Sequence, residues 1–116
     1  MSQPVPQVTA TDVARVMGRD VPAAAQAAVA ELLGRYTEAN GPVSVPRVHL
    51  AVLKLSGGDT EKVAEYVEAA RQDYRDVLAW AEYPRYFARG GFRDEDEQRQ
   101  VIDDDWAEYK AWLDRE

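Results

Sequence analysis

An unbroken series of apolar side chains at steps of three and four residues constrains the fold of this chain most. The series consists of Val63, Val67, Ala70, Tyr74, Val77, Leu78 and Ala81. Side chains at this spacing lie on one face of an α-helix. Asp59 can cap the helix, and Pro84 disfavours helical backbone at the residue before it. The pattern predicts one continuous helix over 60–82, about 33 Å long.

The segment before this helix is ambiguous by periodicity alone. Val48, Leu50 and Val52 alternate as in a strand, whereas Val48, Val52 and Leu55 also fit helical spacing. Ser44 is a good N-cap, a proline follows in the first turn, and two glycines follow as a stop. A lone strand would lack a partner. These signals favour a helix over 43–56, apolar on nearly all faces and central in the fold.

Further helix signals predict an all-α fold, a single compact bundle of five to six helices forming one domain over 1–116. Residues 1–8 hold two prolines and no charge, which is typical of a flexible arm. The helix over 60–82 should pack antiparallel to the helix over 43–56 across Gly57-Gly58. The predicted core consists of Val29, Leu32, Leu33, Tyr36, Val48, Val52, Leu55, Val63, Val67, Tyr74, Val77 and Leu78.

The charge is concentrated at one end. Residues 1–93 hold 11 acidic and 11 basic side chains, whereas residues 94–116 hold 10 acidic and 3 basic ones. The net charge of −7 therefore lies in the predicted acidic C-terminal helix over 94–114. Its stripe of Ile102, Trp106, Tyr109 and Leu113 is too apolar for water. The helix must therefore dock on its own bundle, which we expect, or on a neighbouring chain in an exchanged dimer. Nucleic-acid binding is disfavoured, and a basic partner fits better.

Several kinds of chemistry are excluded or disfavoured. The chain has no cysteine and one histidine, which excludes thiolate sites and two-histidine metal sites. The acidic runs lack the pattern of a calcium loop, so no metal and no cofactor is expected. We expect His49 to bond a backbone carbonyl or a carboxylate such as Asp76. No nucleophile–base pair is recognisable, which disfavours an enzyme without excluding one. No apolar run nears membrane-span length, and no signal-peptide layout is present, which favours a cytoplasmic protein.

Two stretches carry a resemblance. RVHLAVLKLSGGD, from Arg47, and DYRDVLAWAEYP, from Asp73, resemble segments of a group of small uncharacterised bacterial helical proteins. The tail IDDDWAEYKAWL is similar to endings among them. The resemblance implies a bacterial, cytosolic, helical protein and brings no activity, cofactor or site residues with it.

Two functions of different classes follow. The first is a non-catalytic protein-interaction or regulatory module, with a protein partner or a second copy bound at Trp80 and Trp112, which do not fit the apolar stripes. The alternative is a site for a small anionic ligand or a nucleic acid, built from basic and aromatic side chains. The residues of this alternative site are Arg71, Arg75, Arg85, Arg89, Tyr83 and Tyr86. If each arginine pairs with a carboxylate of its own chain, the cluster is structural.

Overall fold

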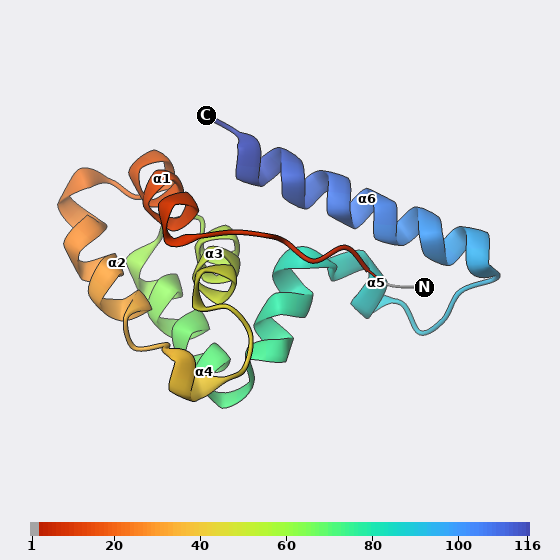
Figure 1. Ribbon diagram of the computed structural model, residues 1–116, viewed down its shortest axis with the longest axis horizontal. Coiled ribbons are helices and arrows are strands. Elements are labelled where there is room, and N and C mark those ends of the chain that lie inside the picture. Colours follow the sequence, from red (N-terminus) through yellow and green to blue (C-terminus); the bar gives the residue numbers. More distant parts are fainter. Residues whose placement is uncertain (1–2) are drawn as a thin grey trace.

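The computed structural model describes residues 3–116 as an all-α fold (Figure 1). Its helices are α1 (Ala10–Asp20), α2 (Gln26–Leu33), α3 (Val45–Ser56), α4 (Thr60–Glu82), α5 (Pro84–Ala88) and α6 (Glu95–Asp114), with short 3-10 turns η1 (Ala23–Ala25) and η2 (Glu38–Asn40). The predicted all-α bundle of five to six helices is confirmed, and no strand occurs among the described residues. None of the helices within this range combines the length and apolar character required to cross a membrane.

The ambiguous segment before α4 is helical and central. Five side chains of α3 are fully buried, namely Val48 and the four from Leu50 to Leu53. The helix ends where Gly57 adopts a left-handed conformation and donates its N–H to the carbonyl of Leu53 at 3.1 Å. α3 packs most extensively against α4 and next against α1. Most of the predicted core is buried, while Leu32, Leu55 and Tyr74 are half-buried.

The prediction of one continuous helix over 60–82 is wrong at Asp73, where α4 bends. Asp73 has extended backbone, with φ −157° and ψ 100°. Its carboxylate accepts the backbone N–H of Arg75 at 3.0 Å, as an N-cap does, so a second helical half begins here. The rings of Tyr66 and Trp80 have centroids 6.4 Å apart, although 14 residues of straight helix span about 21 Å. The bend turns the second half of α4 toward α5 (Figure 1).

The acidic helix α6 docks on its own chain, as predicted. Ile102, Tyr109 and Leu113 are buried against the bundle, and Trp106 is half-buried. Arg19 holds the C-terminal end by donating to the carbonyls of Trp112 at 2.8 Å and of Arg115 at 2.6 Å. A cation at this end also meets the negative end of the helix dipole. The acidic side chains of Asp103 and Asp104 remain exposed.

The segment before α1 lies against the protein. Residues 1–2 of the predicted flexible arm over 1–8 are outside the described residues, and residues 3–8 form no helix. Pro6 is buried, and the carbonyl of Pro4 accepts a hydrogen bond from the hydroxyl of Tyr83. The segment runs from α1 toward α5 (Figure 1). Over residues 3–8 the chain is therefore docked on the end of α4 and does not extend freely.

Candidate functional site

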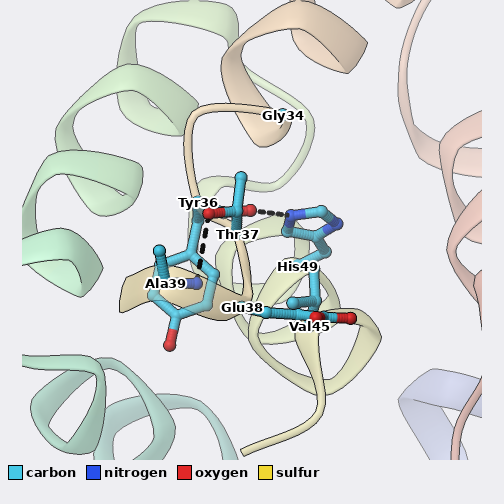
Figure 2. Close-up of a pocket in the computed structure, with 7 residues that line it drawn as sticks. All are labelled: Gly34, Tyr36, Thr37, Glu38, Ala39, Val45 and His49. Atoms are coloured by element: carbon cyan, nitrogen blue, oxygen red, sulfur yellow. Dashed lines mark hydrogen bonds between the residues drawn. The ribbon is translucent and has the colours of Figure 1, made fainter. Parts of the chain in front are cut away.

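A hollow of about 530 Å³ lies beside the single histidine, between the end of α2 and the start of α3 (Figure 2). It is lined by Gly34, Tyr36, Thr37, Glu38, Ala39, Val45 and His49. The Nε2 atom of His49 lies 3.1 Å from the carbonyl oxygen of Tyr36, which confirms the predicted contact with a carbonyl. The Tyr36 hydroxyl points away from the imidazole. His49 therefore ties α3 to the chain that follows α2.

The polar groups around His49 are engaged in local structure. The hydroxyl of Thr37 accepts the N–H of Ala39 at 3.3 Å, and the N–H of Thr37 donates to Asn40 at 2.8 Å. These bonds cap the 3-10 turn η2. Burial lowers the pKa of His49, while its backbone hydrogen bonds partly oppose that shift. The arrangement is that of a half-buried, neutral histidine which stabilises a loop.

His49 makes stability depend on pH near neutrality, where histidine side chains titrate. Its pKa in the folded protein lies below the ordinary value of about 6.5. The unfolded chain thus takes up the proton first, and stability present above pH 6.5 is lost as the pH falls. We expect the urea-unfolding midpoint to fall between pH 7.5 and 5.5. The same titration of His49→Gln should be flatter, and equal slopes in both proteins would contradict this role.

Each of the four arginines of the predicted ligand cluster pairs with a carboxylate of its own chain. The pairs are Arg71 with Glu68 at 3.3 Å, Arg75 with Asp73 at 3.0 Å, Arg85 with Asp105 at 2.9 Å and with Glu108, and Arg89 with Glu97. Arginines that pair with carboxylates of their own chain are expected to have a structural role and not to bind a ligand. Most of these pairs are exposed and contribute little stability individually.

The structure brings only part of this cluster together. Arg85, Tyr86 and Arg89 lie where α5 meets α6, and the ring of Tyr86 stacks on Phe92 with centroids 5.3 Å apart. Tyr83 is buried, and burial beside Glu82 raises the pKa of its phenol to about 12. Arg71 pairs one turn away within the first half of α4. Arg75 and Tyr83 line a separate hollow with Phe87, so the six predicted residues do not all converge on one pocket.

Two ion pairs with a buried carboxylate were not predicted from the sequence. Glu82 is 1% exposed and accepts two hydrogen bonds from Arg47, at 2.9 and 2.7 Å. Asp105, equally buried, accepts the backbone N–H of Tyr86 at 3.0 Å in addition to the Arg85 guanidinium. Glu82 and Arg47 are 35 residues apart in the chain. No local pattern marks such pairs, because their partners come from different helices.

The two tryptophans predicted at an interaction surface have different environments. Trp112 is half-buried against the core, and the Arg19 guanidinium lies 5.2 Å from the centroid of its ring. Trp80 is 47% exposed. Phe87, one of the interleaved basic and aromatic residues that follow α4, is 57% exposed. Trp80 is thus available at the surface, whereas Trp112 contributes to the docking of α6.

Trp80 and Phe87 line the same depression, which we call the Trp80 hollow. It measures about 440 Å³, and its lining consists of Asp76, Ala79, Trp80, Pro84, Phe87 and Ala88. The only other exposed large hydrophobic side chain among residues 3–116 is Val5. Val5 follows Pro4, which is bonded to Tyr83 at the end of α4. The second half of α4 and α5 therefore present most of the exposed large apolar side chains in the described chain.

Neither a metal site nor a similarity to a known protein indicates a function for this chain. Among residues 3–116 no group of three or more His, Asp or Glu side chains is placed to hold a metal ion. No protein-family model, no curated protein and no solved structure matches the chain. The function must therefore be argued from the chain's own surface.

Proposed function

We propose that this protein is a non-catalytic protein-interaction module of a bacterial cytosol and that it binds its partner at the Trp80 hollow. The observation that carries the proposal is the exposure of Trp80 and Phe87 in one depression. Exposed apolar patches of this kind mark binding surfaces, and tryptophan is enriched among the side chains that dominate binding energy. The depression also lies within the usual range of binding-pocket volumes, about 300–1,000 Å³.

The alternative, an anionic-ligand or nucleic-acid site at the arginine cluster, has less support. Its four arginines already meet carboxylates, and a ligand would have to displace those partners. The exposed acidic face of α6 would also repel a phosphate backbone. The interaction surface requires no such rearrangement.

Replacing the two exposed aromatic side chains should abolish partner binding without unfolding the protein. We expect Trp80→Ser with Phe87→Ser to lower the affinity for a purified partner by at least about tenfold, as hot-spot truncations do. Partners are obtained by affinity enrichment, and their dissociation constants are then measured by titration calorimetry. Analytical ultracentrifugation of the wild type tests whether a second copy is the partner.

The control is Glu61→Ser with Lys62→Ser, a pair of exposed side chains on the first half of α4. Circular dichroism must show that both variants remain helical. The proposal fails if the aromatic variant binds every recovered partner as tightly as the wild type does, or if the control loses binding to the same extent.

A further inference from the structure

We infer that the Trp80 hollow receives the cationic side chain of a lysine or arginine from a basic segment of the partner protein. The inference rests on the proposed function and specifies the chemistry of its partner. Asp76 is the only charged side chain that lines the hollow. Within residues 3–116 this exposed carboxylate forms no ion pair and accepts no hydrogen bond from a side chain.

The charges next to the hollow are compensated by partners of their own. Arg75, adjacent to Asp76 in the sequence, is bonded to Asp73 through two nitrogens at 3.0 Å. Arg89, at the end of α5, pairs with Glu97. Asp76 therefore has no ion-pair partner of its own among residues 3–116, and it lines the same hollow as Trp80 and Phe87. A partner cation would supply the missing countercharge.

The aromatic walls suit the same ligand. A lysine or arginine cation is attracted to the face of an indole or phenyl ring, and its aliphatic stem packs on apolar surface. The Trp80 indole is supported by the edge contact with Tyr66, with an angle of 67° between the ring planes. This contact exists because α4 bends at Asp73. The bend thus helps to fix one wall of the hollow.

A purely apolar anchor fits the hollow less well. An aliphatic side chain would cover Trp80 and Phe87 but would remove water from Asp76 without providing a donor. Desolvating a charged carboxylate without a partner opposes binding. The protein as a whole carries a charge of −7, so basic segments are also attracted at long range. Both effects favour a cation over a neutral anchor.

The test uses the full chain and two small probes, N-acetyl-lysine methylamide and its uncharged counterpart N-acetyl-norleucine methylamide. The signal is the indole N–H resonance of Trp80, assigned by comparison with Trp80→Phe. We expect the lysine probe to shift this resonance saturably in the millimolar range. The norleucine probe should bind at least about threefold more weakly, a ratio typical of an exposed cation–aromatic contact.

Two charge-matched variants separate the hollow from the general acidity of the protein. Asp76→Asn should weaken binding of the lysine probe about threefold, whereas Asp103→Asn, on the exposed face of α6, should leave it unchanged. Equal losses in both variants would mean diffuse attraction, and no shift with either probe would mean no site; each result overturns the inference. Equal binding of both probes also overturns it but leaves the proposed interaction surface intact. Loss of partner binding in the aromatic variant tests that surface separately.

Discussion

Replacing Gly58 with alanine should destabilise the protein by about 3–5 kcal/mol, enough to lower its melting temperature by about 10 °C or more. Gly58 has φ +86°, in the left-handed region that side chains rarely adopt. A Cβ atom here would lie 2.3 Å from the carbonyl oxygen of Asp20 and 3.0 Å from its carbonyl carbon. Both are backbone atoms, so no side chain can move aside to make room.

The cost would spread beyond the turn. Asp20 is bonded to the Arg19 guanidinium at 2.8 Å, and the same guanidinium holds the C-terminal carbonyls of α6. Arg19 holds the pKa of Asp20 below its ordinary value. A displaced Asp20 would disturb this contact. The turn between α3 and α4 is therefore coupled to the docking of α6.

Two other glycines provide matched controls for thermal or urea unfolding. A Cβ at Gly57 meets open space, although φ is +63°, so Gly57→Ala should cost only about 1–2 kcal/mol. Gly18 lies within α1, and a Cβ there also meets open space, so Gly18→Ala should stabilise the protein by about 0.5–1 kcal/mol. If Gly58→Ala is no more damaging than Gly57→Ala, the close approach to Asp20 does not constrain the turn.

Truncating Tyr109 should cost about 3–5 kcal/mol, as large-to-small substitutions of buried aromatic residues do. Tyr109 is 1% exposed, and its ring lies between Trp106 and Trp112 with centroids 6.2 and 5.6 Å away. Removal of the ring would leave a cavity beneath α6. We expect Tyr109→Ala to lower the urea midpoint strongly while the helical spectrum persists at low denaturant.

The phenylalanine variant separates the ring from the hydroxyl. The hydroxyl of Tyr109 is buried without a hydrogen-bond partner, and burial raises the pKa of this phenol far above its ordinary value. A buried hydroxyl without a partner is a penalty of about 1–3 kcal/mol. Tyr109→Phe should therefore be as stable as the wild type or more stable. A loss larger than about 1 kcal/mol would show that the hydroxyl has a partner after all.

Trp106 should contribute less to stability than the apolar stripe of α6 suggests. The apolar stripe of α6 implies a core truncation of roughly 3 kcal/mol or more for Trp106→Ala. The structure leaves this indole half-buried, with the Lys110 ammonium 5.9 Å from its ring centroid. We therefore expect a smaller loss than for Tyr109→Ala. An apolar stripe identifies the face of a helix that is buried, but the packing of the neighbouring helices decides which side chain on that face is buried completely.

The Trp80 hollow, too, could be predicted only in part from the sequence. Trp80 stands out in the sequence because it does not fit the apolar stripe of its helix, and it is exposed. Phe87 belongs to the interleaved basic and aromatic residues that follow the long helix, and Asp76 is one of the carboxylates on that helix. Asp76 lies one helical turn before Trp80 on the second half of α4, so spacing alone places these two side chains together. Phe87 joins them because Pro84 starts a new short helix, and sequence spacing cannot show this contact, since it depends on the angle between α4 and α5.

The function of the arginine cluster also cannot be predicted from the sequence. The interleaved basic and aromatic residues from Tyr83 to Arg93 are compatible with a ligand site or with internal ion pairs. The choice depends on which carboxylates approach, and the partners of Arg85 lie on α6, about three to four helical turns beyond the start of that helix. Only the docking of α6 places Asp105 at the first turn of α5.

The helical class, most helix ends and the central place of α3 can be predicted from the sequence, because caps, glycine stops and apolar periodicity act over a few neighbouring residues. The apolar stripe of α6 likewise predicts that this helix docks. The bend at Asp73, the pair of Arg47 and buried Glu82, and the contact of Phe87 with the Trp80 hollow arise only from the packing of the helices. At Asp73 the apolar period continues through the bend, so the period does not reveal it. The other two features join residues from different elements, and their free energies depend on distances that exist only after the helices have packed.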